Sequence, residues 1–166
     1  QTPEIFHCVA DIVGDYVTLK SAGGGSMKGL CPFHEERSPS FHMRPQVGFY
    51  HCFGCGEGGD VFTFLQKMDH VSFAEAVERA ATRAEAAGFD GLAVVDSPNL
   101  AGDPWVGLAP AARETEHLHL GTAVTNPVTR HPAVTAAAAV TLQVASAGRF
   151  VLGIGRGDSA LAHLGR

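Results

Sequence analysis

The sequence has few cysteines, no long hydrophobic run and no excess of basic residues. Four cysteines in 166 residues are too few for a disulfide-rich scaffold, and no apolar stretch is long enough to cross a bilayer. The formal net charge is −5, and neither half of the chain is basic, so any contact with a phosphate backbone is expected to be weak. We expect a cytoplasmic protein without a membrane segment.

Three of the four cysteines lie in a metal-binding pattern. Cys31 and His34 form one pair, Cys52 and Cys55 form another, and seventeen residues separate the pairs. Each ligand-x-x-ligand turn places two donors on one side of an ion, so the two turns complete a tetrahedral set without an open position. The alternative is a pair of disulfides or buried cysteines, which the histidine disfavours. The spacing predicts one structural zinc ion.

The residues around these ligands carry a family resemblance. The run GLCPFHEERSPSF spans residues 29–41, and the run YHCFGCGEGGDVF spans residues 50–62. Together with their flanks, about residues 12–80, they resemble the zinc-binding domain of bacterial replicative DNA primase. The resemblance implies a zinc ribbon whose sheet face helps to bind single-stranded template DNA.

Aromatic and basic residues are interleaved around the two knuckles. Flat rings can stack on bases and cations can contact phosphates, which is the mixture that single-strand binding surfaces use. The alternative for each ring is a place in the small core of the ribbon. The candidate nucleic-acid-binding residues are Lys28, Arg37, Phe41, Arg44, Tyr50 and His51.

The local patterns predict the elements of this half. We expect a strand over residues 15–20, a glycine-rich turn over 21–26, and two strands over 40–44 and 47–51, which together make a small antiparallel sheet. Asp60 is a good N-cap for a short helix. A second helix should begin at the Ser72–Glu75 capping box and end at Gly88.

The rest of the chain carries different motifs. They read GLAVVDSPN over residues 91–99, LGTAVTNPVTRHP over 120–132 and GRFVLGIGRGD over 148–158. Residues 82–166 resemble an N-terminal barrel fragment of the luciferase-like oxidoreductases, especially those that use the deazaflavin coenzyme F-420. The chain is therefore interpreted as a chimera, artificial or recombined, in which the helix over residues 72–88 is shared between a primase part and a barrel part.

Strand and helix patterns alternate in this second part. Strands are expected over residues 91–96, 117–124 and 149–154, with helices starting after Asp103 and His131, which indicates a parallel β/α arrangement. The predicted class is α+β: a zinc ribbon over residues 1–80 and a partial barrel with about three parallel strands over 81–166. Three such strands leave edges and an apolar face uncovered, so we expect a homo-oligomer.

The resemblance also bears on activity. It implies that strand-end loops face the coenzyme, with Asp96, Asn126, Arg156 and Gly157 as remnant cofactor-binding residues and a cis peptide within residues 124–126. Because a barrel site needs a closed ring, no catalytic residue is predicted and bound deazaflavin is not expected. The predicted function is a zinc-binding module with weak single-stranded DNA binding. The alternatives are an inert folded scaffold and a deazaflavin- or flavin-dependent oxidoreductase.

Overall fold

The computed structural model describes residues 8–98 and 100–165, and the chain divides between Ser72 and Phe73 into two compact units. Helix α3 (Phe73–Ala86) thus belongs entirely to the second unit. No helix among the described residues is long and apolar enough to cross a membrane.

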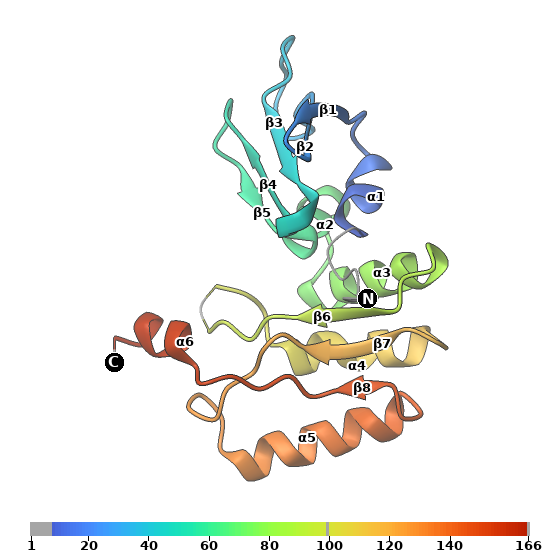
Figure 1. The fold of residues 1–166 in the computed structure, drawn as a ribbon, viewed down its shortest axis with the longest axis vertical. Coiled ribbons are helices and arrows are strands. Elements are labelled where there is room, and N and C mark those ends of the chain that lie inside the picture. Colours follow the sequence, from blue (N-terminus) through green and yellow to red (C-terminus); the bar gives the residue numbers. More distant parts are fainter. Residues whose placement is uncertain (1–7, 99, 166) are drawn as a thin grey trace. The chain divides into compact units, whose positions relative to one another are not determined.

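The first unit is built around a five-stranded antiparallel sheet in the order β1-β2-β3-β4-β5 (Figure 1). Helix α1 precedes the sheet, a 3₁₀ turn joins β3 to β4, and helix α2 follows it. The bounds are α1 Cys8–Gly14, β1 Lys20–Gly23, β2 Ser26–Gly29, β3 Phe41–Arg44, the 3₁₀ turn Pro45–Val47, β4 Phe49–Cys52, β5 Gly58–Gly59 and α2 Val61–Asp69.

The start of this sheet differs from the prediction. The strand expected over residues 15–20 begins only at Lys20, and the glycine-rich segment expected as a turn forms most of the β1–β2 hairpin. Gly24 and Gly25 have φ values of 58° and 74°, which glycine adopts without steric cost, so only two residues are needed to reverse the chain. The strands predicted over residues 40–44 and 47–51 are present as β3 and β4.

Aromatic rings form the core of the first unit. Phe41 and Tyr50 are fully buried and stack with their centroids 5.2 Å apart, and the buried Phe64 of α2 meets both rings edge-on. Helix α2 starts as predicted, because the Asp60 carboxylate accepts the Thr63 amide at 2.8 Å. The core is therefore made from rings on the inner face of the sheet and on α2.

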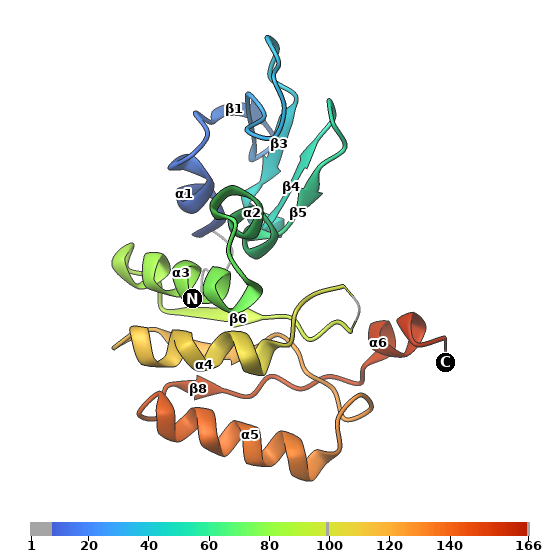
Figure 2. The same cartoon turned by 180° about the vertical axis from the view of Figure 1, so that it is seen from behind.

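The second unit contains a three-stranded parallel sheet in the order β6-β7-β8 (Figures 1 and 2). Helices α3, α4 and α5 lie side by side along the sheet, with α3 against β6, α4 against β7 and α5 against β8. The predicted alternation of strands and helices is confirmed, and Asp103 and His131 cap their helices as expected. The bounds are β6 Gly91–Val94, α4 Pro104–Glu114, β7 His119–Thr122, α5 Pro132–Ala145, β8 Phe150–Val151 and α6 Asp158–His163.

The segment between α4 and β7 is held by one carboxylate. Glu85 of α3 accepts the amides of Glu116, His117 and Leu118 at 2.6–3.1 Å. Burial alone would raise the pKa of Glu85, but these three donors outweigh it and hold the pKa below its ordinary value. The contribution of Glu85 to stability is therefore present at neutral pH and is lost as the pH falls through this lowered pKa.

Candidate zinc centre and nucleic-acid interface

The four predicted zinc ligands come together in the first unit. Cys31 and His34 lie in the loop after β2, Cys52 ends β4, and Cys55 lies in the turn that follows. Their ligand atoms all lie within 4.8 Å of one another, and both Cys31 Sγ to Cys55 Sγ and Cys52 Sγ to His34 Nδ1 measure 3.9 Å. Tetrahedral zinc with bonds of about 2.3 Å separates its sulfur ligands by about 3.8 Å. The donors fit a structural zinc ion.

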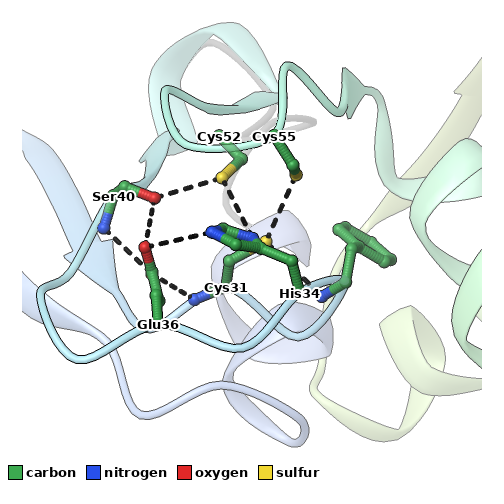
Figure 3. A network of polar contacts seen from close by, with 7 residues as sticks. Cys31, His34, Glu36, Ser40, Cys52 and Cys55 are labelled. Carbon is green, nitrogen blue, oxygen red and sulfur yellow. Dashed lines mark hydrogen bonds and ion pairs between the residues drawn. The ribbon is translucent and has the colours of Figure 1, made fainter.

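A second layer of polar groups holds these ligands in place (Figure 3). Glu36 accepts the Cys31 amide at 2.7 Å, the Ser40 amide at 3.1 Å and the Ser40 hydroxyl at 2.5 Å, and it lies 3.4 Å from His34 Nε2. A carboxylate on the far nitrogen of a ligand histidine fixes the tautomer that leaves Nδ1 free for the metal. The sequence gives no sign of these roles for Glu36 and Ser40, because nothing in the spacing of the ligands identifies them.

The same layer prepares one thiol for the metal. Burial would raise the pKa of Cys52, but the Ser40 hydroxyl, 3.2 Å from Sγ, and the amides of Cys55 and Gly54 outweigh it and lower the pKa to about 6. Gly54 is required here, since a Cβ at this position would lie 2.7 Å from both His34 Nε2 and Ser40 Oγ. These contacts therefore favour the thiolate of Cys52, which is the form that binds zinc, whereas burial raises the pKa of Cys31.

The outer face of the sheet presents a row of polar side chains. Strand register places Lys20 opposite Lys28, Lys28 opposite His42, and His42 opposite His51. Directly opposed residues share a face, and the intervening Met43 and Tyr50 are buried on the other face. These four residues, here called the polar row, cross three strand spacings, or about 14 Å. They form one continuous line of donors and cations.

Exposed rings accompany the polar row. Phe53 is 72% exposed and contacts the rings of His42 and His51 edge-on, with centroids 5.1 and 4.8 Å away. Phe49 is 46% exposed and pairs with Arg44 across β3 and β4 on the same face. These are the rings that a base can reach.

The structure corrects two of the predicted nucleic-acid-binding residues and adds others. Phe41 and Tyr50 were expected to stack on bases, but both are fully buried, because they occupy the inner face of strands whose alternate residues face outward. Lys20 is not among the predicted nucleic-acid-binding residues. Its place opposite Lys28 depends on the β1–β2 hairpin, where the glycine-rich sequence predicts only a turn. Of the other predicted residues, Lys28, Arg44 and His51 lie on the outer face, and Arg37 lies in the loop after the first knuckle.

Three of the four predicted cofactor residues of the second unit form hydrogen bonds or an ion pair with nearby residues. Asp96 accepts the Thr125 hydroxyl at 2.6 Å, and Asn126 Oδ1 accepts the amides of Val128 and Thr129 at 3.0 Å. Asn126 is 2% exposed, whereas Arg156 is largely exposed and pairs with Asp158 at 2.5 Å. Asp96 thus links the loop after β6 to the segment after β7, whereas Asn126 and Arg156 bond within their own segments.

Two further features lie near these strand ends. The cis peptide joins Ala123 to Val124, one residue before the stretch in which the resemblance placed it. A hollow of about 520 Å³ lies beside the ends of the strands, and the Arg130–Asp103 ion pair, 2.5 Å long, borders it. Of the four predicted cofactor residues, Asp96 lines this hollow, whereas Asn126, Arg156 and Gly157 do not.

Comparison with known families agrees with this two-part structure. Residues 5–90 match the family described as CHC2 zinc finger, and residues 60–164 match the family described as luciferase-like monooxygenase. The two matches overlap over residues 60–90, which contain α3.

Individual relatives show the same division. The chain is 67% identical over 75 residues to the DNA primase of Mycobacterium tuberculosis and 60% identical over 73 residues to that of Streptomyces coelicolor. These matches cover 45% and 44% of this chain but only 12% and 11% of the primases. Among solved structures, the coenzyme F420 dependent tetrahydromethanopterin reductase of Methanopyrus kandleri aligns with a TM-score of 0.52 and 33% identity, over 55% of this chain and 26% of the reductase.

Proposed function

We propose that this chain, which belongs to the CHC2 zinc finger family through residues 5–90 and to the luciferase-like monooxygenase family through residues 60–164, is a zinc-dependent module that binds single-stranded DNA weakly. The polar row, flanked by the exposed ring of Phe53, is the observation that carries the proposal. Bases stack on exposed rings and phosphates pair with neighbouring cations. The zinc site keeps β4 and the Phe53 turn in the position that presents these groups.

Weak binding follows from the small number of cations. The outer face offers Lys20, Lys28 and Arg44 as permanent positive charges, and the chain as a whole carries a net charge of −5. Affinity for a nucleic-acid backbone scales with the number of phosphates neutralised, and each contact on a single strand contributes a salt slope of about −0.7. We therefore expect binding that is lost readily as salt is added.

The second unit enters the proposal as a barrel fragment without a complete active site. The hydrogen bonds that Asp96 accepts from Thr125, and that Asn126 accepts from Val128 and Thr129, support this assignment. The primases and the reductase extend far beyond the segments that they share with this chain, and their polymerase and reductase activities are not transferred to it. The chain is then a chimera whose surviving activity lies in its first unit. The alternative hypothesis is that the chain is an inert folded scaffold.

Fluorescence anisotropy with a labelled oligothymidylate of about twelve nucleotides tests the proposal. Replacing Phe53 with alanine should weaken binding about tenfold, since stacking on one ring is worth about 1–3 kcal/mol. The double variant Lys28→Gln, Arg44→Gln should weaken it further and should make the salt slope shallower by about 1.4.

The matched control is Arg113→Gln, which removes an exposed cation from helix α4 of the second unit. It should leave the affinity within a factor of about two, because surface substitutions away from a site have small effects. If the zinc-loaded chain fails to bind the oligonucleotide at low salt, or if all three variants behave alike, the strand-binding proposal is wrong and the scaffold reading stands.

Self-association through the second unit is the other part of the proposal. Helix α5 carries no charged residue and exposes Val134, Val140 and Val144, and Val151 of the last strand is 56% exposed. Exposed apolar residues on unpartnered elements are common at interfaces between chains. We expect light scattering at working concentration to report a dimer or a larger species, and a sharp monomer peak would contradict this.

A further inference from the structure

A basic hollow lies beside the first zinc knuckle. It has a volume of about 510 Å³, and its walls come from the chain before β1, from β1 and β2, and from the knuckle loop. Three cations, Lys20, Lys28 and Arg37, line it, and its described lining contains no acidic residue. The remaining lining residues are Tyr16, Thr18, Gly29, Leu30, Cys31, Pro32 and Pro39.

The charges around this hollow are not balanced by the protein. Lys20 and Lys28 are direct partners across β1 and β2, and like charges placed opposite each other in a sheet repel. Within the described chain, neither lysine nor Arg37 forms an ion pair. The hollow is therefore electropositive in an otherwise acidic protein.

Two carboxylates that contact residues of the lining are already hydrogen-bonded. Glu36, one residue before Arg37, receives the Cys31 and Ser40 amides and faces the zinc ligands. Asp69 accepts the hydroxyl of Tyr16 at 2.8 Å, which places that ring at the edge of the hollow. An anion entering the hollow would thus meet three cations and would not displace an existing partner of any of them.

We propose that this basic hollow binds an oligophosphate, such as a nucleoside triphosphate or the 5′-triphosphate end of an RNA strand. Linked phosphates concentrate several negative charges within one small volume, which matches three cations converging from different segments. A phosphodiester strand spreads single charges along its length and matches the polar row instead. The planar guanidinium of Arg37 can hold two phosphate oxygens at once, and the two ammonium groups can neutralise the neighbouring phosphate.

This inference deepens the proposed function and rests on it, because Lys20 and Lys28 belong both to the basic hollow and to the polar row. Arg37 separates the two sites. It lines the hollow but lies outside the sheet, whereas Arg44 lies on the outer face of the sheet and does not line the hollow. Variants of these two arginines should therefore affect different ligands.

Calorimetric titration of the zinc-loaded full chain with inorganic tripolyphosphate tests the inference at constant ionic strength, since exposed charges are screened by salt. We expect one site per chain. Arg37→Gln and Lys20→Gln should each weaken binding about tenfold, the usual scale for one charge-assisted hydrogen bond, and Arg37→Lys should fall between them and the parent. Arg44→Gln and Arg113→Gln should change it by less than about twofold. Protein-bound zinc is counted after each titration, because tripolyphosphate also binds metal ions.

The source of the phosphate is resolved by two further ligands. An RNA with a 5′-triphosphate should bind more tightly than the same RNA with a 5′-hydroxyl if the hollow receives a strand end, and ATP should compete with tripolyphosphate if it receives a free nucleotide. Arg37→Gln should abolish whichever preference is found.

Failure of this inference is distinguishable from failure of the proposed function. If tripolyphosphate binds no better than sulfate at equal ionic strength, or if Arg37→Gln leaves its affinity unchanged in a protein that retains zinc, the hollow is not an oligophosphate site. Binding of a 5′-hydroxyl DNA oligonucleotide, with loss in Arg44→Gln, would in that case still support the strand-binding face.

Discussion

Replacing Cys52 with serine is expected to unfold the first unit. Structural zinc supplies about 10–16 kcal/mol in small zinc-binding domains, and a serine hydroxyl does not bind the ion as a thiolate does. Cys52 is fully buried at the end of β4, and its sulfur approaches both His34 and Ser40, so its loss removes a ligand and disrupts the support around it. The sheet cannot compensate, because this unit has a small core.

Circular dichroism, limited proteolysis and zinc counting measure this effect. The parent should retain one zinc per chain and a protease-resistant first unit, whereas Cys52→Ser should lose both. Cys8→Ser is the matched control, since Cys8 belongs to neither ligand pair of the sequence pattern, and it should behave like the parent. A Cys52→Ser protein that keeps one zinc and resists protease as the parent does would contradict the assignment.

Replacing Arg149 with methionine should destabilise the second unit by about 3 kcal/mol. The Arg149 guanidinium donates to the carbonyl oxygens of Ala112, Thr115 and Leu118 at 2.7–2.9 Å and to the Thr115 hydroxyl at 2.9 Å. It thereby satisfies the end of α4 and the start of β7. Methionine fills a similar volume but leaves these acceptors without a charged donor. Each buried acceptor that loses its hydrogen bond costs about 1–3 kcal/mol.

Denaturant unfolding followed by the fluorescence of Trp105 reports this change. Trp105 is 7% exposed and contacts Phe150, the residue after Arg149, with ring centroids 5.7 Å apart. The control is Arg156→Met, which removes an exposed side chain paired with Asp158, and it should shift the free energy of unfolding by less than about 0.5 kcal/mol. Equal midpoints for Arg149→Met and Arg156→Met would show that the guanidinium contacts do not stabilise this unit.

Much of the fold could be predicted from local patterns. The ligand spacing identified Cys31, His34, Cys52 and Cys55, because two close pairs of donors have few other uses. Asp60, Asp103 and His131 lie directly before their helices, where side-chain capping is a local interaction that the sequence determines. The alternation of strand and helix patterns in the second part is also a local signal, and it predicted the parallel sheet.

The errors concern features that depend on distant contacts. The segment over residues 15–20 alternates in a way typical of a strand, but pairing begins at Lys20, where β2 becomes available as a partner. Phe41 and Tyr50 look like stacking residues beside their basic neighbours, and only the side of the sheet on which they lie shows that they are buried. Glu36 is one of two adjacent glutamates, and only its contacts with Ser40 and His34 distinguish it from Glu35.

Arg37 shows both what a local pattern predicts and what depends on distant contacts. Its position after the first knuckle suggested a contact with nucleic acid, but the sequence gives no reason to separate it from Arg44. The structure separates them, since Arg37 lines the basic hollow and Arg44 lies on the outer face of the sheet. The distinction between the two ligands proposed for these arginines could therefore not be drawn from sequence.

The most direct test monitors both units in one sample. It asks whether zinc supports the binding module alone and leaves the barrel fragment unaffected. A labelled oligothymidylate is bound to the parent chain, zinc is removed with a chelator, and anisotropy and Trp105 emission are recorded together. Trp105 packs against Phe150 and lies under the Arg130 guanidinium, all within the second unit. We predict that the oligonucleotide is released as one zinc leaves each chain, while Trp105 emission stays unchanged. Binding that persists in the zinc-free chain would contradict the account.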